Sequence, residues 1–175
     1  AGSVIHFTDG RWTGTNFTDE GRLSLTLTDD VAAGTVITIN NADAFSPTST
    51  HGAVQLDVTG FTMGLGSSNE VLYAYVGDVN APTAVIAAIA NNSFAAAALD
   101  GTGLVEGVNA ISLASIVPDA DFAVYDGPRL GPSSFADFLP VINNPANWLA
   151  QDGSGDQGND GAAPDLPFST AGFTD

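Results

Sequence analysis

An Asp/Gly-rich stretch between residues 151 and 165 carries the side chains best suited to chemistry. Asp152, Asp156 and Asp160 recur at every fourth position, with glycines between them. Because glycine lets the backbone turn tightly, carboxylate oxygens at this spacing can converge on one point. Calcium accepts about six to eight oxygen ligands in tolerant geometry. The stretch therefore predicts a Ca²⁺ site, with a flexible polar loop as the alternative.

The loop can be aligned with the 12-residue calcium loop of an EF-hand, with Asp152 at position 1. Position 12 is Ala163 and position 6 is Gln157, where an EF-hand has glutamate and glycine. The comparison favours an irregular calcium loop over a true EF-hand. The predicted ligands are the residues at positions 1, 3, 5, 7 and 9 and one later acid: Asp152, Ser154, Asp156, Gly158, Asp160 and Asp165.

A second pair of acids flanks a turn near the start of the sequence. Asp9 and Glu20 stand on either side of the segment that contains Arg11. Two carboxylates brought together by such a turn can bind a second cation. In the alternative interpretation, Asp9 caps the turn and Glu20 pairs with Arg11 or Arg22.

The chain of 175 residues is strongly acidic. Its formal net charge is −17, from 17 Asp and 3 Glu against three Arg and no Lys, and it has no cysteine. Such a surface excludes the basic face that nucleic acids require. No apolar run is long enough to span a bilayer, so no membrane insertion is expected. The composition suits divalent cations, or a protein that stays soluble in salty water.

The sequence lacks the residue patterns of common catalysts. His6 and His51 are the only histidines, and neither belongs to an HExxH pattern, so zinc is not expected. No G-x-S-x-G nucleophile elbow is present. We therefore predict that the protein is not an enzyme, and we keep a secreted hydrolase with paired carboxylates as an alternative.

Aromatic residues raise a further alternative, a carbohydrate-binding module that recognises extracellular polysaccharide. The candidates for a sugar-stacking platform are Trp12, Trp148, Tyr73, Tyr75 and Tyr125. Tyr73 and Tyr75 are predicted to share one strand face. Aromatic side chains in a β protein more often belong to the core.

Short segments with alternating hydrophobicity dominate the chain and predict its elements. The predicted strands cover residues 4–8, 23–28, 35–39, 54–58, 70–76, 84–90, 110–113 and 122–125. Ser133 or Ser134 is predicted to cap a short helix through Ile142, which Pro140 bends or starts with a 3₁₀ turn. We predict one mainly β domain over residues 1–175. Its fold is a β-sandwich of two antiparallel sheets with one or two short helices.

Three groups of short motifs carry a resemblance to a known family. The first is Ala1–Asp9 with Trp12 and Glu20-Gly21. The second is Ala33–Ile37 with Leu72–Val76. The third is Asn147-Trp148, the Asp/Gly loop and Leu166-Pro167-Phe168. Together they resemble a family of secreted bacterial β-rich domains of large surface or calcium-associated exoproteins. The resemblance spans nearly the whole chain and implies a fold and a location more than an activity.

One departure from the family pattern suggests how the protein could assemble. Members usually carry an extra strand before the segment that begins here at Ala1. Without that strand the sheet would expose an edge that can accept a strand from a neighbouring molecule. We therefore predict an extracellular structural or adhesive module, stabilised by calcium and self-associating into a filament or surface layer. Calcium in the Asp/Gly loop would hold the C-terminal segment onto the sandwich.

Overall fold

Ten strands form one large sheet and two small ones. A computed structural model of the chain describes residues 1–57 and 62–175. The strands are β1 (Val4–Thr8), β2 (Arg22–Thr26), β3 (Ile39–Asn40), β4 (Thr48–Ser49), β5 (Ala53–Leu56), β6 (Val71–Asp78), β7 (Ala81–Ala90), β8 (Ala110–Ser112), β9 (Phe122–Tyr125) and β10 (Trp148–Gln151). Six of them form the main sheet in the order β5-β2-β1-β6-β7-β8, while β3–β4 and β9–β10 form two-stranded ribbons.

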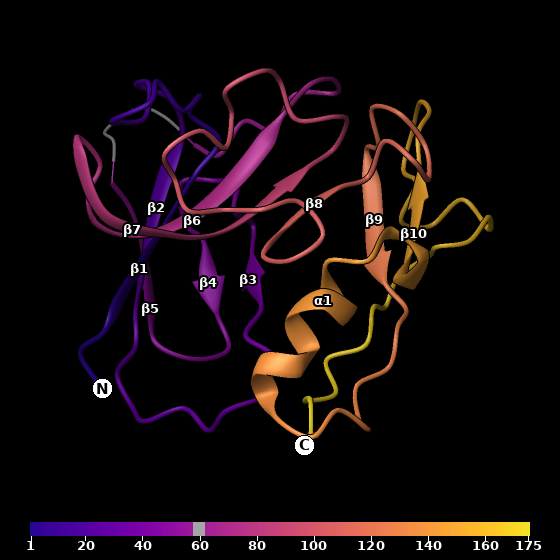
Figure 1. The fold of residues 1–175 in the computed structure, drawn as a ribbon. Coiled ribbons are helices and arrows are strands. Elements are labelled where there is room, and N and C mark those ends of the chain that lie inside the picture. Colours follow the sequence, from indigo (N-terminus) through magenta and orange to yellow (C-terminus); the bar gives the residue numbers. More distant parts are fainter. Residues whose placement is uncertain (58–61) are drawn as a thin grey trace.

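All pairings in the main sheet are antiparallel except the last. β8 runs parallel to β7, with Ile89 opposite Ile111. The prediction of purely antiparallel sheets is wrong at this position. A parallel partner needs a long crossover, and residues 91–109 supply it by passing over one face of the sheet (Figure 1).

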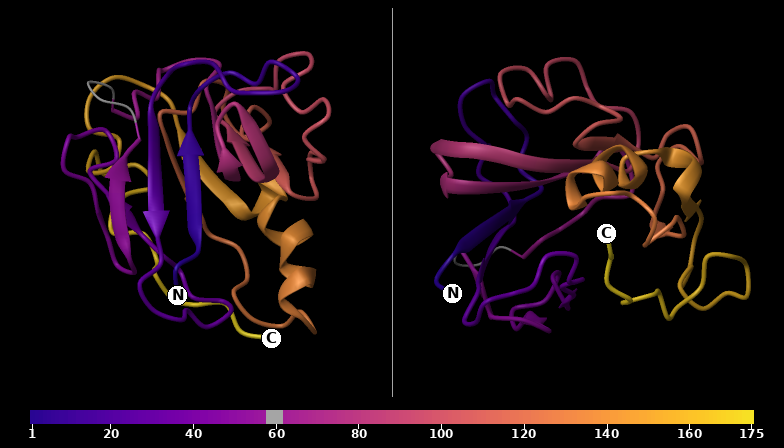
Figure 2. Two further views of the ribbon diagram at one scale, coloured as in Figure 1. Left: turned by 90° about the vertical axis from the view of Figure 1, so that its left-hand side faces the viewer. Right: turned by 60° about the horizontal axis from the view of Figure 1, so that its bottom comes forward.

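One face of the main sheet is apolar and carries both ribbons. Cross-strand pairing places Phe7 beside Leu23 and Ala74, and Leu72 beside Ile89. Ile39 of β3 lies over Phe7 and Leu23. Trp148 and Ala150 of β10 pack against the cluster that contains Ile111. Figures 1 and 2 show the ribbons on the side of the sheet opposite the crossover. The predicted mainly β, sandwich-like fold is confirmed.

The opposite face is covered by loops and not by a sheet. The ring of Phe17 packs against three aromatic neighbours. Its centroid lies 5.0 Å from that of Trp12, 5.1 Å from that of Tyr73 and 5.0 Å from that of Tyr75. Leu104, from the crossover, completes this cluster. Burial of these rings fixes residues 10–20 and 91–109 against the sheet.

Several element boundaries differ from the sequence-based expectation. Residues 35–38 are not a strand, because the opposing chain offers only the two residues of β4, so pairing is limited to Ile39 and Asn40. The strand β10 was not predicted. The predicted strand over residues 84–90 is confirmed and begins earlier, at Ala81. The expected end of one strand at Val58 lies outside the described residues.

The helical part is short, as Pro140 predicts. A 3₁₀ turn, η1 (Phe135–Phe138), continues into α1 (Leu139–Ile142), and a second 3₁₀ turn, η2 (Pro145–Asn147), precedes β10. Ser134 precedes η1, but its hydroxyl donates to the Asp137 carboxylate at 2.8 Å instead of capping a backbone N–H.

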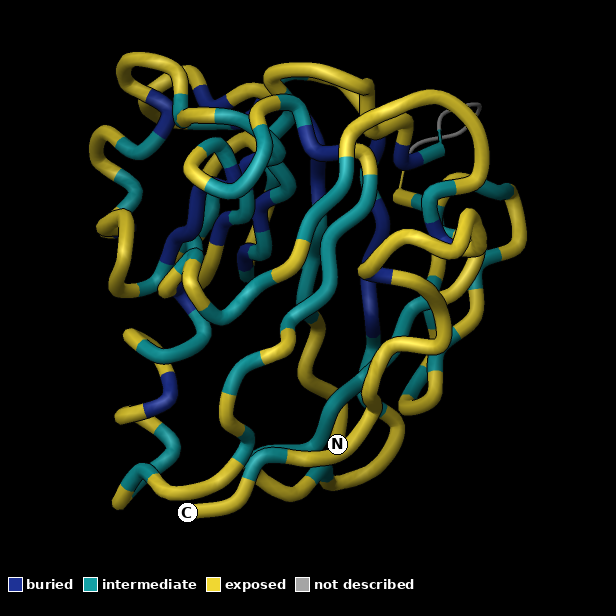
Figure 3. The backbone as a smooth tube through the Cα atoms, turned by 90° about the vertical axis from the view of Figure 1, so that its right-hand side faces the viewer, coloured by how far each residue is buried: buried dark blue, intermediate teal, exposed yellow. Residues whose placement is uncertain are grey.

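The C-terminal segment is held by Arg129. Its guanidinium donates to the carbonyl oxygens of Ala171 at 2.7 Å and Ser169 at 3.0 Å. The same group lies 4.9 Å from the centre of the Phe173 ring and 5.4 Å from that of Tyr125. Most of residues 159–175 is exposed (Figure 3). One cation and one ring therefore anchor the tail.

Candidate functional site

Two acids of the Asp/Gly loop, Asp156 and Asp160, accept hydrogen bonds from residues two or three positions later in the chain. Asp156 accepts from the Gly158 amide at 3.2 Å and from Asn159 Nδ2 at 3.0 Å. Asp160 accepts from the Ala162 amide at 2.8 Å. These contacts span two or three residues, as in Asx turns. Asp152, Ser154 and Asp165 are exposed.

A side-chain amide organises the same loop from within. Gln151 Nε2 lies 2.7 Å from the carbonyl oxygens of Ala162 and Pro164, and 3.2 Å from that of Gln157. The Gly158 carbonyl, a predicted ligand, instead accepts from the Leu166 amide at 2.8 Å. Within residues 1–57 and 62–175, no group of three or more His, Asp or Glu side chains stands ready to hold a metal ion. Calcium binding by this loop stays a prediction.

The second predicted pair of acids lines a pocket together with a third acid. Asp9, Glu20 and Glu70 line one pocket of about 200 Å³. It lies between the turn that follows β1 and the segment that precedes β6. Glu70 was missed by sequence reasoning, because fifty residues separate it from Glu20 and no local pattern connects them.

Asp9 is the buried member of this group. Its exposed fraction is 8%. One oxygen, Oδ2, accepts from the Gly64 amide at 2.9 Å, while Oδ1 is buried without a hydrogen-bond partner. The backbone amides of Asp9 itself and of Gly21 also act on this carboxylate, so the alternative in which Asp9 caps its turn stays a prediction. Asp9 connects that turn to a segment far along the chain.

The electrostatics of the pocket disfavour negative charge. Burial raises the pKa of Asp9 and the charge of Glu20 adds to the rise, against the lowering effect of the backbone amides of Gly64, Asp9 itself and Gly21. Burial also raises the pKa of Glu70, with Asp9 and Glu20 adding to it. Arg22 pairs with Asp19 at 2.8 Å, and the ion pairs of the described residues include neither Arg11 nor Glu20, so the predicted pairing of Glu20 with Arg11 or Arg22 is wrong. Glu20 instead accepts from the Thr18 hydroxyl at 3.4 Å.

A polar cluster on the looped face of the sheet resembles catalytic machinery in composition only. Asp57 accepts from His6 Nδ1 at 2.8 Å and from the Ser24 hydroxyl at 2.6 Å. In a Ser–His–Asp triad the histidine lies between the other two and takes the serine proton. Here the aspartate is central, so His6 does not activate Ser24. His6 stacks on Tyr75, with ring centroids 5.1 Å apart.

The predicted sugar-stacking aromatics are committed to internal contacts. Tyr73 and Tyr75 share one strand face, as predicted, but each is only 1% exposed. Burial raises the pKa of both to about 12. Trp12 Nε1 and Trp148 Nε1 donate to the Asp100 and Ile142 carbonyls, each at 2.7 Å. These side chains therefore do not form an exposed row.

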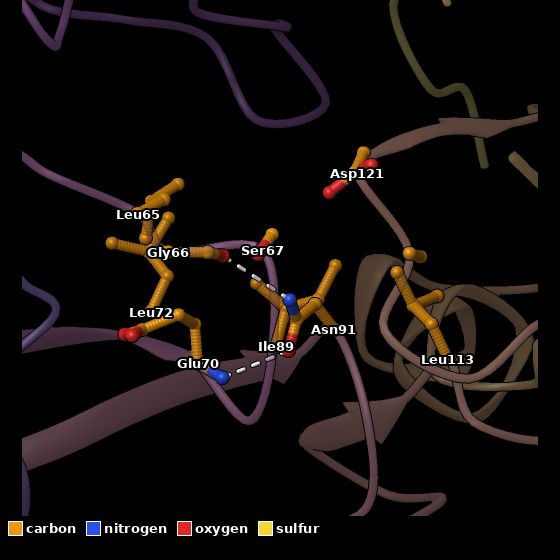
Figure 4. Close-up of a pocket in the computed structure, with 10 residues that line it drawn as sticks. Leu65, Gly66, Ser67, Glu70, Leu72, Ile89, Asn91, Leu113 and Asp121 are labelled. Carbon is orange, nitrogen blue, oxygen red and sulfur yellow. Dashed lines mark hydrogen bonds between the residues drawn. The ribbon is translucent and has the colours of Figure 1, made fainter. Parts of the chain in front are cut away.

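An apolar groove runs across the sheet between the two ribbons. Three cavities of about 370, 230 and 270 Å³ lie along it, and each has Leu72 in its lining. Phe7 and Ile89 extend the floor to β1 and β7. Figure 4 shows Leu65 and Leu72 on one side of the 370 Å³ cavity and Leu113 across from them. Ile39 of β3 and Trp148 of β10 stand on the two flanks.

Sequence reasoning did not find the groove. Its floor was predictable as the apolar face of alternating strands, but its openness depends on where the ribbons lie. We call this surface, from Ile39 to Trp148 over Phe7, Leu72 and Ile89, the inter-ribbon groove.

The chain matches no family model, no curated protein and no solved structure. The helices of the described residues are all too short or too polar to cross a bilayer.

Proposed function

We propose that this protein is a non-catalytic extracellular structural module that self-associates, with a β-strand of a second copy entering the inter-ribbon groove. The observation that carries the proposal is the apolar floor of Phe7, Leu72 and Ile89, which stays only partly buried between the two ribbons. In a closed sandwich the second sheet would bury this floor. An added strand would complete that second layer.

The backbone around the groove is suited to accept a strand. Each ribbon has only two strands, so β9 and β3 each have one edge outside a described ladder. Edge N–H and C=O groups are templates for pairing with another chain. A strand entering the groove would gain main-chain hydrogen bonds from an edge and side-chain burial from the floor.

The exposed area of the chain supports a subunit that is completed by a partner. The chain exposes 9119 Å². A monomer of 17.7 kDa is expected to expose about 7,900 Å². The excess of about 1,200 Å² is larger than the roughly 800 Å² that each partner buries in a standard interface.

Charge sets the conditions for assembly. Two copies with a net charge of −17 each repel one another over roughly 10 Å at moderate salt. Salt or divalent cations reduce that repulsion and leave the apolar contact in the groove. We therefore expect self-association to increase with ionic strength and with Ca²⁺. An extracellular location fits these conditions and the acidic composition.

A matched pair of substitutions tests the groove. Leu65 lines two of its cavities and Val105 lies outside all three, yet both are 56% exposed. We expect Leu65→Gln to shift the wild-type oligomer or filament to monomer, and Val105→Gln to leave it unchanged. Light scattering coupled to size exclusion and electron microscopy provide the measurement. A wild type that stays monomeric at high concentration with salt and Ca²⁺ would refute the proposal.

The two alternatives have weaker support. A carbohydrate-binding module would need an exposed aromatic row, and Trp12, Tyr73 and Tyr75 are buried. A hydrolase of the serine type would need Ser24 to donate to His6, and it donates to Asp57. A hydrolase with paired carboxylates stays an alternative, because Asp9, Glu20 and Glu70 line one pocket.

A further inference from the structure

The pocket shared by three acids has no counter-charge from the described chain. The ion pairs of the described residues join Ala1 to Asp30, His6 to Asp57 and Arg22 to Asp19. None of them includes Asp9, Glu20 or Glu70. A buried carboxylate is ordinarily paired or hydrogen-bonded at both oxygens, because an isolated buried charge is costly. Asp9 Oδ1 satisfies neither condition.

Asp9 Oδ1 is buried beside Gly21, and both residues line the pocket. A Cβ added at Gly21 would stand 3.0 Å from Asp9 Oδ1 and closer still to the Thr62 carbonyl oxygen. Gly21, Thr62 and Asp9 all line the pocket. Two oxygens of different chain segments therefore border the same small space, which a side chain at position 21 would fill.

We propose that Asp9, Glu20 and Glu70 bind one Ca²⁺ ion in this pocket, with the Thr62 carbonyl oxygen as a further ligand. Every available donor is an oxygen, and neither histidine nor cysteine lines the pocket. Such a set suits a hard cation. Calcium tolerates irregular geometry and carbonyl ligands, whereas Mg²⁺ demands a regular octahedron and keeps most of its water.

Binding requires only a small rearrangement. The three carboxylates are not already gathered into a compact group in the described structure. Glu20 is exposed and is held by one long contact to Thr18 at 3.4 Å, so its side chain can swing toward Asp9. The volume of about 200 Å³ also leaves room for water ligands.

This site would join three parts of the fold. Asp9 and Glu20 belong to the turn between β1 and β2, Thr62 to the segment leading to β6, and Glu70 to the start of β6. An ion there would crosslink them without a disulfide, in a chain that has no cysteine. The inference does not rest on self-association, because it concerns a site within one copy.

Calcium titration of dilute monomer tests the site. We expect calorimetry to show one ion per chain. At about 100 times its dissociation constant, Ca²⁺ should raise the thermal midpoint by roughly 5–10 °C. Asp9→Asn and Glu70→Gln should each weaken binding at least about tenfold, the effect of losing one charged ligand contact.

Two controls make the result decisive. Asp160→Asn removes the same charge from the Asp/Gly loop and should keep the wild-type calcium response. Glu20→Gln changes an exposed residue, so it tests the pocket even if Asp9→Asn fails to fold. Wild-type affinity in both Glu20→Gln and Glu70→Gln would overturn the proposal. Loss of binding in Asp160→Asn alone would move the ion to the Asp/Gly loop.

Discussion

Gln151 Nε2 and the Pro164 carbonyl oxygen lie 2.7 Å apart and close the Asp/Gly loop from inside. The same nitrogen also reaches the carbonyls of Ala162 and Gln157. An amide has two protons, so these three acceptors share two donors. The loop therefore owes its shape to one neutral side chain as well as to its glycines.

Replacing Gln151 with leucine should loosen this loop. The substitution keeps the side-chain size but leaves partly buried carbonyl oxygens without a donor, at a cost of about 1–3 kcal/mol. We expect faster limited proteolysis and amide exchange within residues 152–166, with a smaller effect on the main sheet. Leu149→Met, at an exposed position on the same strand, serves as the control. Unchanged protection of the loop in Gln151→Leu would show that the amide does not hold it.

The raised pKa values of Asp9 and Glu70 give stability a definite pH dependence in calcium-free buffer. An acid whose pKa is raised by folding contributes stability that is full below its unfolded pKa and lost as pH rises through the folded pKa. We therefore expect the wild type to lose stability relative to Asp9→Asn between acidic and neutral pH. Urea unfolding at a series of pH values measures the difference. A wild type whose free energy of unfolding rises relative to that of Asp9→Asn over this pH range would contradict the expectation.

Calcium should reverse the order of these two proteins. Without Ca²⁺ at neutral pH, Asp9→Asn removes an uncompensated buried charge and should be at least as stable as wild type. With Ca²⁺ at about 100 times the wild-type dissociation constant, the wild type gains more binding energy than the variant, so its thermal midpoint should become the higher one. Thermal unfolding of both proteins with Ca²⁺ and with EDTA provides the measurement. Parallel responses in both proteins would argue against a bound ion at Asp9.

The aromatic cluster under the crossover should dominate the stability of the looped face. Phe17 is 3% exposed and contacts three rings, whereas Phe45 is 71% exposed. Truncation of a buried phenylalanine to alanine costs about 3–5 kcal/mol. We expect Phe17→Ala to show a loss of this size in urea unfolding and Phe45→Ala to lose less than about 0.5 kcal/mol. Similar losses in the two variants would show that this cluster is not a core.

The central strands could be predicted because their pattern is strong and local. Leu23 and Leu25 alternate with Ser24, and the pairing in the structure places them on the apolar face as expected. The strand β4, the short extent of β3 and the parallel pairing of β8 could not be predicted, although a strand was predicted over residues 110–113. Their positions depend on contacts between distant segments, which override weak local preference.

The candidate site also contains residues that the sequence predicts and one that it does not. Asp9 and Glu20 were recognisable because a short turn separates them, while Glu70 comes from a strand start fifty residues later. The Asp/Gly loop gave the strongest sequence signal, yet its acids bond to their own turns. Spacing shows that carboxylates can meet, but only the path of the backbone decides which ones do.

The anchoring of the tail by Arg129 bears on resistance to proteases. Proteases that cleave after basic residues find only Arg11, Arg22 and Arg129 in this chain. At Arg129 the guanidinium is already engaged by two carbonyl oxygens and two rings, and Arg22 is paired with Asp19. A trypsin-like enzyme must pull these side chains free before its specificity pocket can accept them. Because the chain has only three arginines and contacts hold two of them, we expect trypsin-like enzymes to cleave it slowly.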